Sequence, residues 1–220
     1  MNNVRIVHWS VESFVPAPAT GRKPPPLSAT VCVASRALRT VLVATRPNHI
    51  AVEQMSVRAR QTQQRLAYGI LGAVSAVAAE LSACPEGAVA CTAGFIAPST
   101  KSRMMAAPNV SASATYQQRK AASIEAVDRL LRENGDDNWR LWFDALPKKD
   151  DASDALLLAL VALGRRDDDA HRVAAIDVGE RHCGVCVVEA RRVPKRATTE
   201  YDGAPIVCRR RRPLRSCVAL

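Results

Sequence analysis

The chain has 220 residues, of which 48% are hydrophobic, and it carries a formal net charge of +10. This length suits one domain with appendages, and the hydrophobic content is enough for a core. The longest apolar stretch, 66–79, is expected to be too short to span a bilayer, and the composition of the first residues predicts no secretory signal. The seven cysteines are odd in number and irregularly spaced, which favours free thiols in a reducing, intracellular compartment over a disulfide framework.

Apolar periodicity predicts strands alternating with helices, hence an α/β layer fold that contains an antiparallel hairpin. The N-terminal strand is expected at 3–10 and is followed by a proline-rich loop at 16–26. The remaining expected elements, in chain order, are a helix at 27–44, a strand at 50–54, a helix at 58–83, a strand at 88–96, a helix at 113–132, a helix at 151–163, and hairpin strands at 173–178 and 183–188.

The helix expected at 151–163 begins with acidic residues and is otherwise apolar nearly all round. Asp151 and Asp154 are three residues apart, so their side chains project to the same side of the helix, where they could hold a divalent cation. The apolar remainder predicts a buried helix whose carboxylates lie at the edge of a core. A bound metal would relieve the repulsion between carboxylates in that position.

Two further acids lie on expected strands. Asp177 precedes the glycine turn of the C-terminal hairpin, and Glu53 ends the strand at 50–54. One acid on each of two strands together with a pair on a helix is the arrangement of a two-metal nuclease. Carboxylate ligands suit two Mg²⁺ ions, with Mn²⁺ as a substitute.

These segments resemble a known family, the ribonuclease H-like Holliday junction resolvases, which include the bacterial RuvC and poxvirus enzymes. The segment 176–186 resembles their first strand and turn, and 52–54 resembles their glutamate-bearing strand. The segments 95–101 and 116–120 resemble the later strand and basic helix start, and 149–155 resembles the terminal acidic helix. The resemblance implies a mixed sheet flanked by helices, with catalytic and metal-binding acids at Asp177, Glu53, Asp151 and Asp154.

The order of the segments differs from that family, because the Asp-x-Gly strand comes last instead of first. A circular permutation would explain the order, with the first hairpin moved to the C-terminal part and the new join at 164–173. The strand at 3–10 would then pair with 184–190, and residues 1–190 would form one nuclease domain. The alternative is that Asp177 belongs to a chance Asp-x-Gly in a fused tail, which would leave an inactive remnant.

Basic residues are expected to hold nucleic-acid phosphates. Residues 190–220 contain nine Lys or Arg against two acids, so 191–220 is predicted to be a basic, disordered tail that either binds DNA or only targets the protein. Other basic residues fall at the starts of elements near the acids. The predicted DNA-binding residues are Arg58, Arg60, Lys101, Arg103, Arg119, Lys120, Arg209, Arg210, Arg211 and Arg212.

Two smaller patterns have competing interpretations. His182, Cys183 and Cys186 have a spacing compatible with zinc, but without a second ligand pair a buried strand is favoured. The aromatic group at 139–143 favours core or dimer packing over base stacking.

The function implied by the resemblance is resolution of four-way DNA junctions by paired phosphodiester hydrolysis. Junction symmetry calls for two cuts, and the resemblance to the family implies that a homodimer makes them on branched DNA. Two alternatives stay open, namely another ribonuclease H-like nuclease acting on RNA·DNA hybrids or flaps, and an inactive DNA-binding protein.

Overall fold

The structure, a computed structural model, describes residues 3–13, 25–56, 59–84, 90–97, 114–164, 171–179 and 182–191. Within them lie a mixed five-stranded sheet and five helices, so the predicted α/β class is confirmed. The strands are β1 (Asn3–Ser13), β2 (His49–Glu53), β3 (Thr92–Ile96), β4 (Arg172–Val178) and β5 (His182–Arg191). The helices are α1 (Leu27–Thr45), α2 (Gln61–Ser82), α4 (Tyr116–Asn134), α5 (Asp137–Ala145) and α6 (Asp150–Gly164).

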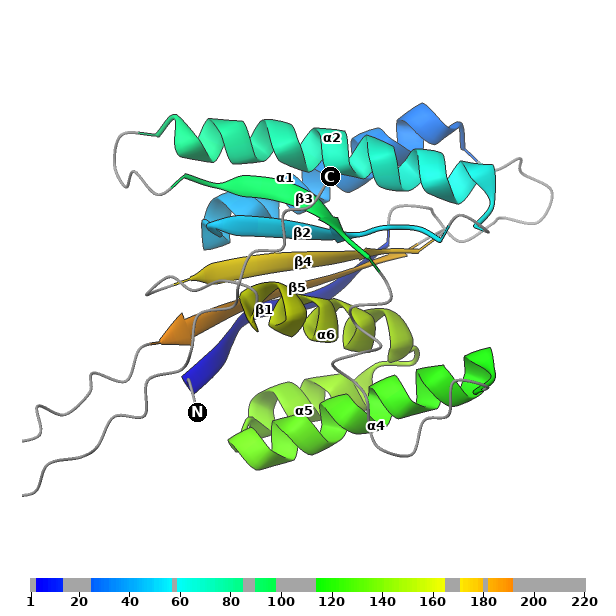
Figure 1. Ribbon diagram of the computed structural model, residues 1–220, viewed down its shortest axis with the longest axis vertical. Helices are drawn as coiled ribbons and strands as arrows, with labels where there is room; N and C mark the ends of the chain where they lie inside the picture. Colours follow the sequence, from blue (N-terminus) through cyan, green and yellow to red (C-terminus); the bar gives the residue numbers. More distant parts are fainter. Residues whose placement is uncertain are drawn as a thin grey trace, which may run out of the picture.

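The sheet has the order β1-β5-β4-β2-β3, which places the last two described strands, β4 and β5, between β1 and β2. β5 pairs antiparallel with both β4 and β1, whereas β2 runs parallel to β4 and β3 runs parallel to β2. The predicted pairing of the N-terminal strand with 184–190 is confirmed, because Val4 lies opposite Ala190 and Val11 lies opposite Gly184. Residues from both ends of the described chain therefore form neighbouring strands (Figure 1).

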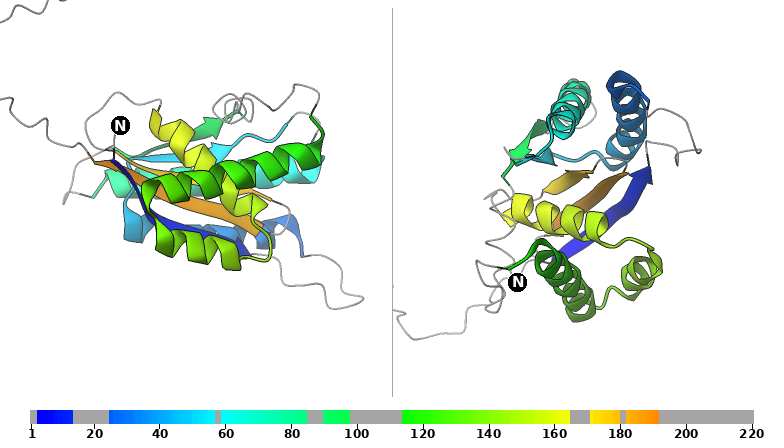
Figure 2. Two further views of the ribbon diagram at one scale, coloured as in Figure 1. Left: turned by 90° about the horizontal axis from the view of Figure 1, so that it is seen from below. Right: turned by 90° about the vertical axis from the view of Figure 1, so that its right-hand side faces the viewer.

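Helices cover both faces of the sheet (Figures 1 and 2). α1 and α2 lie side by side on one face, where Leu38, Leu42 and Ile70 pack against Ile50 and Ile176. α6 lies on the other face, with α4 and α5 outside it. The hydrophobic core on this second face contains Leu156, Leu158, Val127, Leu131 and Phe143. Alternation along the strands divides the side chains between these two cores.

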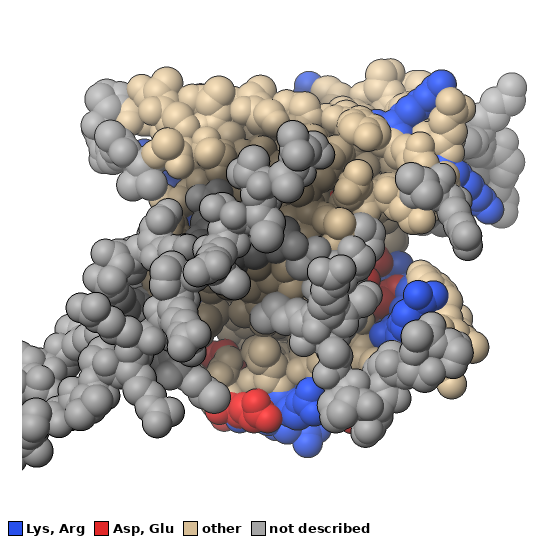
Figure 3. Space-filling model, in the orientation of Figure 1, with Lys and Arg blue, Asp and Glu red and all other residues tan. Residues whose placement is uncertain are grey.

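The helices α1 and α2 are each long and apolar enough, by length and composition alone, to cross a bilayer. The apolar stretch 66–79 was predicted to be too short, but polar residues at both ends extend α2 to 22 residues. Core helices of soluble proteins meet the same criterion. One side of each helix packs against the sheet, and in Figure 3 the surface over α2 carries few charged side chains compared with the layer of α4 and α5.

Most predicted elements exist with shifted ends, and one helix was missed. α4 begins three residues later than predicted because Thr115 caps it, accepting from the Gln118 backbone N–H. It ends at Asn134 and is capped by Gly135, whose φ of 68° is the left-handed conformation that suits glycine. The short helix α5 begins two residues after Gly135 and carries the aromatic group of 139–143. The sequence predicted that this group packs but did not predict a helix there.

The aromatic group packs in the core, as favoured from the sequence. Trp9 of β1 is 3% exposed and stacks on Phe143 with ring centroids 5.2 Å apart. Trp142 lies 4.9 Å from Trp9, whereas Leu141 is 71% exposed. Trp9 was not recognised in the sequence as the partner of this group.

The cysteines of β5 do not form a metal site with each other. Cys183 lies in the core under α1 and α2, whereas Cys186 lies in the core under α6, on the opposite sheet face. Both are buried free thiols, so the buried-strand interpretation is confirmed. Burial raises the pKa of both thiols, and the charges of Asp177, Glu12 and Asp151 raise that of Cys183 further.

Candidate metal site

Glu53 and Asp177 lie side by side near the carboxyl ends of β2 and β4, because these two neighbouring strands are parallel. The register pairs Val52 with Ile176, so the next residue of each strand is an acid. Ala51 and Ala175 belong to the core under α6. Side chains two residues further along each strand point to the same face, so both carboxylates face α6.

Asp154 completes an acidic triad from the first turns of α6. One ligand oxygen from each of Glu53, Asp154 and Asp177 lies within 4.8 Å of the others. Glu53 is 9% exposed and Asp177 is 8% exposed, while Asp154 is partly exposed. Carboxylates this close together repel one another when they are ionised. A divalent cation between these oxygens would relieve that repulsion, and the donor set is the one that Mg²⁺ and Mn²⁺ prefer.

Gly184 lets α6 approach the sheet closely enough to form the triad. It lies opposite Asp177 on β4 and opposite Val11 on β1. A Cβ built on Gly184 would overlap the carbonyl oxygen of Asp151 and lie 2.8 Å from its carbonyl carbon. Only glycine fits at this contact between β5 and the first turn of α6.

Trp9 fixes the same turn from the other side. Its indole Nε1 donates to the carbonyl oxygen of Ala152 at 3.0 Å. This buried hydrogen bond joins β1 to α6, and the stacked rings of α5 hold the indole in place. Gly184 of β5 and Trp9 of β1 thus determine how closely α6, which carries Asp154, approaches the sheet and how it is oriented.

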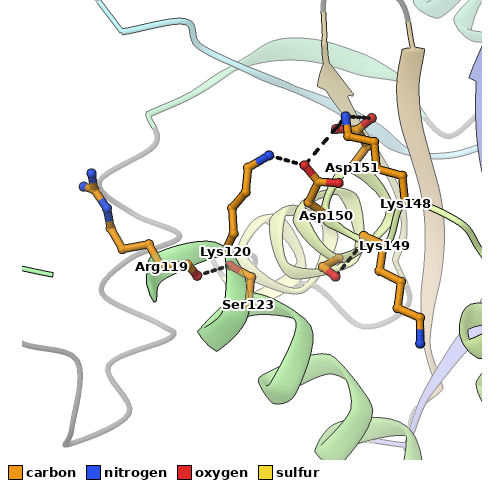
Figure 4. Close-up of polar contacts among 8 residues, drawn as sticks. Arg119, Lys120, Ser123, Lys148, Lys149, Asp150 and Asp151 are labelled. Carbon is orange, nitrogen blue, oxygen red and sulfur yellow. Dashed lines mark hydrogen bonds and ion pairs between the residues drawn. The ribbon is translucent and has the colours of Figure 1, made fainter. Parts of the chain in front are cut away.

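Asp151 is the one predicted acid that the structure does not place in the triad. Its two carboxylate oxygens accept from Lys148 Nζ at 3.0 Å and 2.8 Å. The neighbouring Asp150 accepts from Lys120 of α4 and lies 3.6 Å from Lys148 Nζ. Figure 4 shows the four side chains in order of alternating charge at the amino end of α6.

The ion pairs shift the titration of these groups. Burial alone would raise the pKa of Asp150, but the hydrogen bond from Lys120 and the charges of Lys148 and Lys120 lower it overall. Burial alone would lower the pKa of Lys148, but its hydrogen bond to Asp151 and the charges of both acids raise it overall. The pKa of Lys120 is raised in the same way by Asp150 and Tyr116. All three groups are therefore charged at neutral pH.

Three of the predicted DNA-binding residues lie in the described part of the chain. Arg60 precedes α2 and is exposed, and Arg119 in the first turn of α4 is exposed and points away from the ion pairs in Figure 4. Lys120 is paired with Asp150. The other predicted contacts, Arg58, Lys101, Arg103 and Arg209 to Arg212, lie outside the described residues, as do most of the predicted join and all of the tail beyond Arg191.

The sequence-based reasoning missed Lys148, Asp150, Trp9 and Gly184 as parts of the site. The lysines at 148 and 149 directly precede the acids, and a spacing of three residues would have pointed to the pair of Lys148 with Asp151. The roles of Trp9 and Gly184 depend on contacts between distant segments and left no local signal. Comparison of the chain with protein-family models, curated proteins and solved structures gave no match.

Proposed function

We propose that the chain is a metal-dependent endonuclease of ribonuclease H-like fold that resolves four-way DNA junctions. The observation that carries the proposal is the convergence of Glu53, Asp154 and Asp177 from two parallel strands and a helix. These are three of the four acids that the family resemblance selected, although they lie far apart in the sequence.

The strand order supports the same fold. Read from β4, the chain forms an antiparallel meander of β4, β5 and β1, then adds β2 and β3 parallel to β4. This is the arrangement expected for a ribonuclease H-like domain whose first hairpin has moved to the C-terminal part. The permutation therefore accounts for the position of Asp177 at the centre of the sheet, beside Glu53.

The acids of the triad and the basic residues are proposed to have different roles, metal binding and phosphate binding. A divalent cation at the triad would supply an activated water and neutralise charge on the phosphodiester. Glu53 and Asp177 would hold it from the sheet, and Asp154 would hold it from α6. Asp151 remains the predicted fourth ligand. Arg60, Arg119 and Lys120 are proposed to hold backbone phosphates, as are the predicted basic residues outside the described part of the chain. By analogy with the family, the paired cuts in a symmetric junction are proposed to be made by a homodimer.

A nicking assay with labelled substrates tests the proposal. We expect the full chain to nick four-way junctions in Mg²⁺ or Mn²⁺ in preference to RNA·DNA hybrids, flaps and linear duplexes. Asp177→Asn, Glu53→Gln and Asp154→Asn should each reduce nicking by at least about 100-fold while junction binding persists. Asp144→Asn is the matched control, because it removes one acid of α5 that is paired with Lys149 and is not part of the triad.

Each other outcome has a definite meaning. Nicking of hybrids or flaps in preference to junctions would retain the nuclease and change its substrate class. Binding without nicking by the unaltered chain would favour the inactive DNA-binding protein. Full activity of Asp177→Asn would contradict the assignment of the site.

A further inference from the structure

The carboxylate of Asp151 already binds a cation, the ammonium of Lys148. Both of its oxygens accept from Lys148 Nζ, at 3.0 Å and 2.8 Å. Asp151 lies three residues before Asp154 on α6, and side chains at this spacing are neighbours on a helix surface, which puts the ion pair of Asp151 on the side of α6 that carries Asp154. A cation-binding position next to the triad is therefore occupied by the chain itself.

The two members of this pair differ in freedom to move. The side chain of Asp151 is 11% exposed, and its helix turn is fixed by Gly184 and Trp9. The side chain of Lys148 is 54% exposed, and Lys148 precedes the helix. Because the lysine side chain is more than half exposed, water screens its attraction to Asp151, so a divalent cation can displace the ammonium. The carboxylate would stay in place when the lysine leaves.

We propose that Lys148 is an exchangeable internal cation that masks Asp151, and that a second divalent cation binds beside the triad only when Lys148 leaves. This inference rests on the proposed function and adds a regulatory step to the same site. Substrate phosphates attract Lys148 and the neighbouring Lys120, so bound nucleic acid draws the ammonium away from Asp151. The second cation position then forms with substrate in place.

Lys149 provides a matched control for this proposal. It is adjacent in sequence and carries the same charge, but it pairs with Asp144 of α5 at 2.9 Å. Figure 4 shows its side chain pointing away from the amino group of Lys148. Lys148→Met and Lys149→Met therefore remove equal charge from neighbouring positions, and only the first exposes Asp151.

Calorimetric titration of the full-length protein with Mn²⁺, without nucleic acid, tests the inference. We expect the unaltered protein to bind one Mn²⁺ at the triad. Lys148→Met should bind a second Mn²⁺, or bind Mn²⁺ roughly three- to fivefold more tightly. Lys149→Met should titrate like the unaltered protein, and the double variant Lys148→Met/Asp151→Asn should lose the gain. Lys148→Gln serves as a second variant, and circular dichroism checks that each protein is folded.

The outcomes separate this inference from the proposed function. If Lys148→Met titrates like the unaltered protein while Asp177→Asn abolishes Mn²⁺ binding, the masking role is wrong and the metal site stands. An equal gain in Lys149→Met would show a general effect of charge and would also overturn the masking role. Absence of Mn²⁺ binding in all the proteins would overturn both proposals.

Discussion

Gly184 of β5 and Asp151 of α6 are in direct backbone contact, at a position where any side chain would overlap the Asp151 carbonyl oxygen. Because Gly184 also lies opposite Asp177 in the sheet, the contact sets the distance between the helix and the central acid. Gly184 thus helps to determine how close Asp154 of α6 lies to the acids of the sheet.

Gly184→Ala should push α6 away from the sheet. The added methyl group would meet helix backbone and, at 3.1 Å, the Cβ of Ala155, neither of which can rotate aside. We expect a loss of about 1 to 3 kcal/mol in the free energy of unfolding, as for other overpacked sites. We also expect weaker Mn²⁺ binding, because Asp154 moves with α6. Urea unfolding and Mn²⁺ titration measure the two effects.

The control for this substitution is Gly72→Ala on α2. A Cβ at Gly72 meets nothing within 4 Å, and the residue lies inside a helix. Alanine is favoured over glycine there by about 1 kcal/mol, so the control should be neutral or stabilising. Equal stability of both variants would show that the contact at Gly184 is not tight.

The sequence predicted much of the fold because hydrophobic periodicity is a local property. Strands such as β4 and β5 read as continuous apolar runs, since helices cover both faces of the central sheet. Three of the predicted acids meet in the triad because each lies near one end of an apolar strand or helix. The partner of Asp151 was not predicted, since a lysine just before a helix can either face solvent or turn back to the first acids.

Contacts between segments far apart in the chain were the other feature that the sequence did not predict. The hydrogen bond from Trp9 to Ala152 joins residues 143 positions apart, and nothing near Trp9 in the sequence indicates it. The helix α5 was missed because its nine residues are too few to show a clear helical repeat.

Trp9→Phe should separate the hydrogen-bonding role of this side chain from its packing role. The phenyl ring can keep the stacking on Phe143, but the carbonyl of Ala152 loses the indole donor. We expect a loss of about 1 to 2 kcal/mol in urea unfolding. Trp142→Phe makes the same exchange in a ring of the same cluster, 4.9 Å from Trp9, and should cost less. A smaller loss for Trp9→Phe than for Trp142→Phe would count against a role for the hydrogen bond.

The pair of Lys120 with Asp150 should make stability depend on pH in the acid range. The pKa of Asp150 is lowered in the folded protein from its ordinary value of 3.8. A carboxyl group with a lowered folded pKa stabilises the fold above its unfolded pKa, and that contribution disappears as the pH falls through the folded value. We therefore expect Asp150→Asn to lower the melting temperature near neutral pH, and to show a smaller further drop between about pH 5 and about pH 2 than the unaltered protein.

Lys120→Met should reproduce part of that flattening, because it removes the hydrogen bond and one of the two ammonium charges that lower the pKa of Asp150. Thermal unfolding followed by circular dichroism at several pH values gives the comparison. An unchanged slope in both variants would mean that the pair contributes nothing to folding.

Reordering the chain tests the permuted assembly directly. Ending the chain at Ala170 removes β4 and β5, the strands between β1 and β2 in the sheet. The rest of the sheet would be split and its apolar faces exposed, so we expect insoluble or molten protein without nuclease activity. Placing residues 171–191 before Asn3, with the chain still ending at Ala170, should restore the fold. A short Gly-Ser linker suffices because Arg191 and Asn3 are paired residues on adjacent antiparallel strands. The reordered protein should melt near the temperature of the unaltered one, bind Mn²⁺ and nick junctions. A soluble and active 1–170 fragment would show that β4, with Asp177, is dispensable and that the permuted assembly is wrong.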